Sequence, residues 1–174
     1  MRKSFPLLLA IILIAANANA QHSGSSEKFG HTLNLGLGIG YYGYVDHNIP
    51  VIHLNYEFDV AKDFTLAPFI TFYSHQHKYY HQTVIPIGVK GSYYFDNILK
   101  ANAKWDFYLA GSLGFALRNT RWNDGYDRES DYHGGAGPLY LDLHIGTEYH
   151  FNKRIGTFLD LSTGVSTIGL SFHK

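Results

Sequence analysis

A two-residue alternation of apolar and polar side chains recurs along the chain from residue 31 to its end. It is clearest over residues 51–60, where the even positions are Ile52, Leu54, Tyr56, Phe58 and Val60 and most odd positions are polar. Successive side chains of a β-strand point to opposite faces, so this period indicates half-buried strands. Since no segment shows a helical period, residues 31–174 are predicted to be all β.

The alternation divides into eight strands, with short connections at one end and mostly longer ones at the other. The predicted strands cover residues 31–44, 51–60, 64–76, 83–95, 105–118, 139–151, 155–163 and 166–173. One connection, residues 119–138, is long and polar, which is typical of a functional or mobile loop. Eight antiparallel strands in chain order predict a closed up-and-down barrel.

Two kinds of eight-stranded barrel fit this pattern: a soluble lipocalin-like barrel that binds an apolar ligand inside, and a transmembrane barrel with its apolar face outside. The polar face carries small residues, which suit a crowded interior: Gly36, Gly38, Gly40, Gly88, Ala110, Ser112, Gly114, Ala116 and Gly146. Aromatic residues gather at the apolar-face ends beside the short turns, as at a membrane interface. They are Phe58, Phe64, Tyr93, Phe95, Trp105, Phe107, Tyr149, Phe151 and Phe172. The sequence therefore favours an eight-stranded antiparallel transmembrane β-barrel.

Pro68 and Pro86 fall inside two predicted strands. Proline lacks the N–H that a β-ladder needs, and a closed barrel has no edge strand to accommodate it. We expect either β-bulges at these positions or strand ends that rise beyond the membrane.

The first twenty residues read as a cleavable signal peptide. Arg2 and Lys3 precede an apolar run over residues 5–16, and Ala18-Asn19-Ala20 supplies the small-residue cleavage pattern. Residues 21–30, rich in Ser and Gly, are predicted to form a flexible segment. Residues 31–174 are then the barrel of an exported protein.

The leader, the eight strands, the opening strand LNLGLGIGY (residues 33–41) and the closing strand GLSF (residues 169–172) carry a resemblance. The chain resembles the small eight-stranded outer-membrane β-barrels of Gram-negative bacteria, such as the transmembrane domain of outer-membrane protein A and the small porin-family barrels. The resemblance implies residence in the outer membrane, contact with its lipid and lipopolysaccharide, and insertion by the outer-membrane assembly machinery. It also implies a monomer.

Composition narrows the chemistry. Lys and Arg number 14 against 14 Asp and Glu without a basic cluster, so no nucleic-acid partner is expected. The absence of Cys excludes disulfides, thiolate metal sites and Cys nucleophiles. No cofactor is expected.

Inward-facing charges predict an interior network. Its members are Glu57, Lys90, Asp106, Arg118, Asp142, Glu148 and Asp160. Buried charges persist only when paired, so Lys90 and Arg118 are expected to meet carboxylates such as Asp142, Glu148 or Asp160. An eight-stranded barrel is about wide enough for its own side chains. A plugged interior is expected, and the alternative is a path for small solutes, ions or protons.

Two further sites are considered at the ends of the barrel. His75, His77 and His81 lie close in sequence on the long-loop side, where their spacing suits Zn²⁺ or Cu²⁺, although histidine also serves as an ordinary rim residue. Ser74 with His75, or Ser171 with His173, would be the nucleophile and base of a lipid-modifying enzyme. Adjacent strand residues point apart and no acid is evident, so the chain is expected not to be an enzyme.

The expected role is that of a structural anchor that displays surface loops, with adhesion as one possible use. The 119–138 loop region contributes Arg121, Trp122, Tyr126, Arg128 and Tyr132 as external contacts. Arg, Trp and Tyr dominate binding hot spots. The external partner is not identified by the sequence, and the alternatives are the soluble periplasmic barrel and the lipid-modifying enzyme.

Overall fold

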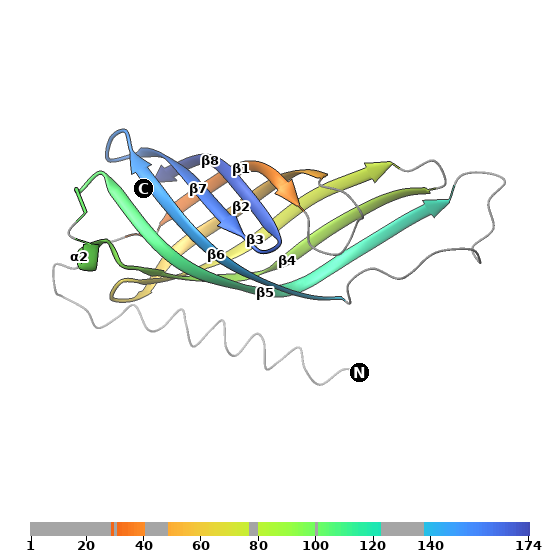
Figure 1. The fold of residues 1–174 in the computed structure, drawn as a ribbon, viewed down its shortest axis with the longest axis horizontal. Coiled ribbons are helices and arrows are strands. Elements are labelled where there is room, and N and C mark those ends of the chain that lie inside the picture. The colour runs from red at the N-terminus through yellow and green to blue at the C-terminus, as the bar shows by residue number, and fades with distance from the viewer. Residues whose placement is uncertain (1–28, 30, 41–48, 77–79, 100, 123–137) are drawn as a thin grey trace.

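The computed structural model describes residues 29, 31–40, 49–76, 80–99, 101–122 and 138–174. Eight strands form a closed barrel in chain order, each antiparallel to the next, and β8 pairs with β1 (Figure 1). They are β1 (Thr32–Gly40), β2 (Ile49–Ala61), β3 (Phe64–Gln76), β4 (Tyr80–Tyr94), β5 (Trp105–Trp122), β6 (Leu139–His150), β7 (Ile155–Ser162) and β8 (Val165–His173). The predicted all-β, eight-stranded antiparallel barrel is confirmed.

One short helix, α2 (Asp96–Leu99), interrupts the β structure and corrects the prediction that residues 31–174 are entirely β. The amides of Ile98 and Leu99 donate to the carbonyl of Phe95 over 3.0 and 3.2 Å, which closes the turn. Four residues are too few to leave a helical period in the sequence. Among the described residues, no helix has the length and apolar character needed to cross a membrane.

The two prolines lie at gaps in strand pairing, so bulges, one of the two alternatives that the sequence suggested, are wrong. Pairing of β2 with β3 lapses opposite Pro68, and pairing of β3 with β4 lapses opposite Pro86, while the register is the same on both sides of each gap. The register shift lies elsewhere, between Asp59 and Ala61. A missing donor therefore costs local pairing on one side only, because the neighbouring strand on the other side stays in register.

The outer face of the barrel is apolar, and the buried polar and charged side chains of the strands lie on the inner face. Leu37, Ile52 and Leu143 are 65%, 58% and 69% exposed, whereas Asn55 and Thr71 are each 1% exposed. A soluble barrel that binds an apolar ligand needs the opposite arrangement, so that alternative is wrong for this fold.

Rings on the outer face cluster where β5 begins and β6 ends. The centroids of Trp105 and Tyr149 are 4.8 Å apart, and those of Tyr149 and Phe151 are 5.5 Å apart. Phe107 lies beside Trp105 at 6.2 Å. An aromatic cluster at the edge of an apolar band is typical of the interface girdle of a membrane barrel.

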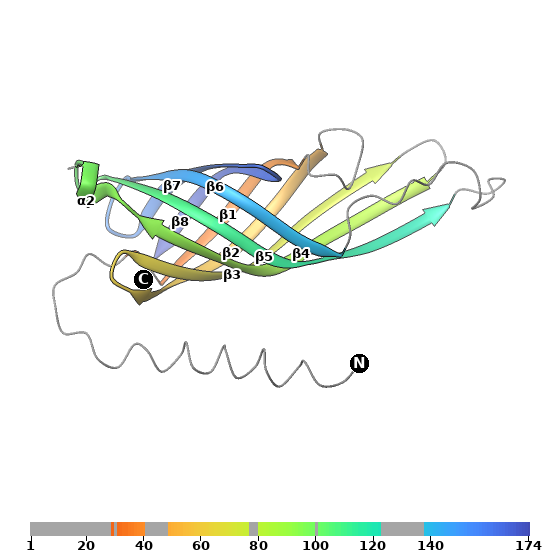
Figure 2. The same ribbon diagram turned by 60° about the horizontal axis from the view of Figure 1, so that its bottom comes forward.

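The two ends of the barrel differ. One end, called here the α2 end, holds α2, the short turns after β2 and β6, and the C-terminus (Figures 1 and 2). At the opposite end, called the loop end, β3, β4 and β5 extend past the other strands. The strand lengths reflect this: β5 has 18 residues and β7 has 8.

Glycines on the inner face make room for aromatic rings. A Cβ on Gly146 would overlap the ring of Tyr108, and a Cβ on Gly36 would lie 2.9 Å from Cζ of Phe158. Both rings are almost fully buried, at 4% and 5% exposed. The lumen is therefore packed by side chains that depend on bare backbone opposite them.

Candidate functional site

The centre of the interior is an ion pair that crosses the lumen. Lys90 Nζ of β4 lies 3.0 Å from Asp160 Oδ2 of β7, and β4 and β7 stand three strands apart round the barrel. Tyr108 donates to the same oxygen over 2.9 Å, and His144 Nδ1 lies 2.7 Å from Oδ1. Asp160 is one of the carboxylates that the sequence named for Lys90. A buried pair is stable only with such additional hydrogen bonds.

Glu57 anchors a second group on the neighbouring wall. Its Oε1 accepts hydrogen bonds from the hydroxyls of Thr65 and Tyr94, the latter over 2.8 Å. Its Oε2 accepts from Asn34 Nδ2 over 3.3 Å, and that amide also donates to Asn55 Oδ1 over 3.0 Å. Three donors thus hold a carboxylate that is 3% exposed. Side chains from β1, β2, β3 and β4 are joined through it.

Asp142 lies 3.7 Å from His144 Nε2 and also binds the turn between β7 and β8. Its carboxylate accepts from the hydroxyls of Ser162 and Thr163 over 2.8 Å each and from the amide of Val165 over 3.0 Å. Asp142 therefore holds the β7–β8 turn at the loop end. Arg118 is half-buried in β5, opposite Val84 of β4.

The interior towards the loop end is apolar. A buried cluster there consists of Val51, Phe69, Tyr73, Val84, Ala116, Tyr140 and Val165. The rings of Phe69 and Tyr140 lie 5.7 Å apart. This cluster fills the lumen above the charged groups, so polar and apolar packing follow one another along the axis.

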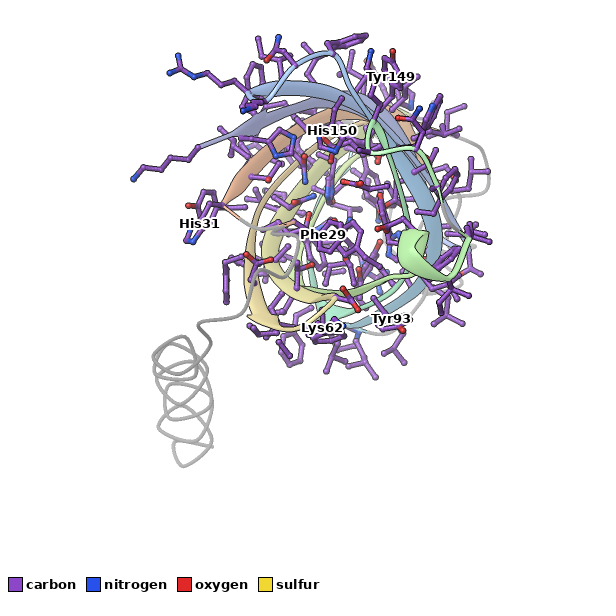
Figure 3. All side chains as sticks on the ribbon, turned by 90° about the vertical axis from the view of Figure 1, so that its left-hand side faces the viewer. Phe29, His31, Lys62, Tyr93, Tyr149 and His150 are labelled. Atoms are coloured by element: carbon purple, nitrogen blue, oxygen red, sulfur yellow. The ribbon has the colours of Figure 1, made fainter. Side chains whose placement is uncertain are left out.

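Phe29 closes the α2 end. Its ring stacks on Tyr94 with centroids 4.0 Å apart and planes 6° apart, and Figure 3 shows it in the middle of the opening. Its amide donates to Asp59 Oδ1 over 3.1 Å, and the Thr32 hydroxyl donates to its carbonyl over 3.1 Å. The flexible segment predicted over residues 21–30 is thus corrected at Phe29, because a stacked ring and two backbone hydrogen bonds fix it. Residues 21–28 and 30 lie outside the described residues.

The side chains predicted to act at the loop end are described only in part. His81 Nε2 lies 3.0 Å from Ser74 Oγ, so the structure brings Ser74 to His81. Arg121 is exposed near the end of β5. His77, Tyr126, Arg128 and Tyr132 lie outside the described residues, as do the side chains of His75 and Trp122. The metal site and the external contacts at this end remain predictions.

Sequence reasoning missed a histidine and carboxylate cluster at the α2 end. Glu148 and His150 of β6 meet His173 of β8 and Asp106 of β5 there. The inward direction of Glu148 and Asp106 was predicted, but the register of their strands was not. These side chains meet because the registers of β5, β6, β7 and β8 bring them to the same level along the barrel axis, and the sequence pattern does not give those registers.

No protein-family model matches the chain, and no curated protein matches its sequence. Solved structures do. Neisserial surface protein A superimposes with a TM-score of 0.56 at 12% identity, covering 82% of this chain and 95% of that one. A de novo designed transmembrane β-barrel gives a TM-score of 0.50 at 11% identity, covering 84% of this chain and 98% of that one. The fold of this chain is thus that of the small eight-stranded outer-membrane β-barrels.

Proposed function

We propose that the protein is an outer-membrane anchor with a sealed interior, which displays its loop-end connections outside the cell. The α2 end with its short turns then faces the periplasm. One observation carries the proposal: Phe29, the Lys90–Asp160 pair and the apolar cluster fill the lumen in succession along the described strands. An eight-stranded barrel leaves little room beyond its own side chains.

The apolar outer band and the aromatic cluster near the α2 end support residence in a membrane. Outer-membrane lipid and lipopolysaccharide are the proposed surroundings, reached through a cleavable signal and the outer-membrane assembly machinery. Spin labels at Leu54 and Leu143 test this directly, with Asn55 and His144 as inward controls. In lipid vesicles, the outward labels should contact oxygen more readily than a water-soluble relaxation agent. The reverse result would mean that Leu54 and Leu143 face the interior and that Asn55 and His144 face outward, which would contradict the proposal.

Conductance tests the sealed interior. Purified protein in a planar bilayer should show no stable channels, because charged and aromatic side chains occupy the axis. The variant Phe29→Ala/Tyr94→Ala removes the stacked pair at one mouth, and Leu113→Ala is its control on the outer face. Stable openings of large conductance in the unmodified protein would contradict a sealed lumen and favour ion passage.

The proposed role includes no catalytic step. Ser74 and His81 are within hydrogen-bond distance at the loop end, so lipid modification needs its own test. Lipid A mass spectra should be identical in cells that produce the protein and cells that produce Ser74→Ala. A difference in acyl chains that depends on Ser74 would assign an enzyme activity to this rim.

A further inference from the structure

Glu148, His150 and His173 converge at the α2 end of the barrel. One ligand atom from each lies within 4.8 Å of the others. Figure 3 looks into this opening and shows His150 on the inner side of the wall. β6 and β8 are separated by β7, which carries Gly156 at this level, paired with His150 on one side and Ser171 on the other. A Cβ on Gly156 would overlap Glu148 Oε1, so the glycine lets the residues of β6 and β8 meet.

The partner of His150 fixes its proton. Nε2 of His150 lies 2.7 Å from Asp106 Oδ2, and a carboxylate accepts hydrogen bonds. The proton of the neutral imidazole therefore lies on Nε2 and the lone pair on Nδ1. That Nδ1 lies 3.9 Å from Glu148 Oε1. A histidine held by a carboxylate through its outer nitrogen is the usual arrangement around a protein-bound metal.

The proton of His173 is fixed through Thr32. The Thr32 hydroxyl donates its one proton to the carbonyl of Phe29, so it accepts from His173 Nδ1 over 2.9 Å. Nε2 of the neutral His173 then carries the lone pair, and it lies 2.6 Å from Glu148 Oε1. Two basic nitrogens thus face one carboxylate oxygen. A lone pair and a carboxylate oxygen at this distance repel each other unless a cation lies between them.

The charges and distances suit a divalent ion. Glu148 and Asp106 supply carboxylate oxygens, and His150 and His173 supply imidazole nitrogens, close to one another at this end. Zinc binds nitrogen and oxygen ligands at about 2.0–2.2 Å, which puts tetrahedral ligands roughly 3.3–3.5 Å apart. The observed separations of 2.6 and 3.9 Å lie on either side of that range. A small shift of the Glu148 carboxylate therefore reaches zinc geometry.

We propose that Glu148, His150 and His173 form a site for a divalent transition metal, with zinc the best fit, and that Asp106 and Thr32 orient the two imidazoles. The side chains of His150 and His173 are 23% and 14% exposed, so an ion reaches them from the opening. The bound ion would join β6 to β8 beside the seam where β8 pairs with β1. Three protein ligands leave a fourth position for water.

Zinc titration tests the site in untagged, metal-stripped protein folded in detergent. Isothermal calorimetry with zinc chloride should find one equivalent per chain. His150→Gln and His173→Gln should each weaken binding at least about tenfold, and Asp106→Asn should weaken it about 10–100-fold, as orienting partners do. The triple variant His75→Gln/His77→Gln/His81→Gln is the matched control and should bind as the unmodified protein does.

Heat-dependent gel mobility checks that each variant has folded. If a variant does not fold, zinc X-ray absorption of the control triple variant counts the imidazole ligands. Two imidazoles support the proposal, and any other number contradicts it. No zinc binding by the unmodified protein would also overturn the proposal. The cation between Glu148 and His173 would then be a proton. Full binding by His150→Gln/His173→Gln, or loss of binding in the loop triple variant, would move the metal elsewhere.

Discussion

The barrel fills its two halves by different means. Towards the α2 end, a network of charges and hydroxyls around Lys90, Asp160 and Glu57 occupies the lumen. Towards the loop end, the apolar cluster around Phe69 and Val84 does so. The strands of the wall are continuous through both halves. The comparison teaches that the same eight strands can enclose either a hydrogen-bonded polar network or a packed apolar cluster.

The two halves should respond to different faults. A buried polar network loses most when one partner is removed, because the other charge is left without compensation. An apolar cluster loses in proportion to the volume removed, or to any unpaired polar group added.

The largest effect is expected from breaking the central ion pair. Lys90→Met should lower the free energy of unfolding by about 3–5 kcal/mol, because it leaves Asp160 charged and buried. Lys90→Met/Asp160→Asn should be more stable than Lys90→Met alone. Urea unfolding in lipid vesicles, followed by Trp fluorescence, measures both. If the losses of unfolding free energy from Lys90→Met and Asp160→Asn simply added up in the double variant, Lys90 and Asp160 would not be coupled, and the polar half would not respond as proposed.

A reciprocal exchange of equal-sized side chains sharpens the comparison. Val84→Thr adds a hydroxyl to the apolar half, and Thr65→Val removes the hydroxyl that donates to Glu57 Oε1 in the polar half. Each should cost about 1–3 kcal/mol, because each leaves a buried polar group without its partner. Urea midpoints measure both variants. A neutral Val84→Thr would show that water reaches the apolar half.

Shape matters in the polar half as well. Gly146→Ala should destabilise the protein by about 1–3 kcal/mol, because its methyl group would collide with Tyr108 and shift the hydroxyl away from Asp160. The control is Gly111→Ala, on the outer face, where the nearest atom to the new methyl is Leu143 Cδ2 at 3.9 Å. Equal unfolding curves for the two variants would count against close packing around Tyr108.

The smallest effect concerns α2, outside the strands. Burial raises the pKa of Asp96, and its Oδ1 has no hydrogen-bond partner within the described part of the chain. The folded state therefore holds the proton more tightly than the unfolded state. Stability should fall as pH rises from the unfolded pKa through the folded one.

Asp96→Asn removes that fall. At neutral pH the free energy of unfolding of this variant should exceed that of the unmodified protein by about 0.5 kcal/mol or less, so its urea midpoint should be slightly higher. This gain should vanish in acid. Unfolding midpoints collected across the acidic range measure this. A gain that grew towards low pH would have the opposite sign and contradict the assignment.

The strand count and sidedness were predictable because they depend only on the two-residue period. Leu54 and Asn55 lie on the faces that alternation assigns to them, and β3 has the bounds predicted for it. Partners across the lumen were not predictable, because period alone does not give register. Three carboxylates were equally suitable for Lys90, and only the stagger of the strands selects Asp160.

Other features lacked a local signal. α2 is too short to be periodic, and the position of Phe29 depends on its stacking with Tyr94, which lies far away in sequence at the end of β4. His173 meets Glu148 only because Gly156 leaves space in the strand between them. Such contacts belong to the closed barrel and to no segment alone.

The stack of Phe29 on Tyr94 also bears on the order of folding. It joins the segment before β1 to the end of β4, so the ring can settle only after the first four strands have come together. A single hairpin does not bring Phe29 and Tyr94 together. A spectroscopic probe at this pair would consequently report the assembly of β1 to β4, and would separate it from the earlier arrival of the strands at the lipid surface.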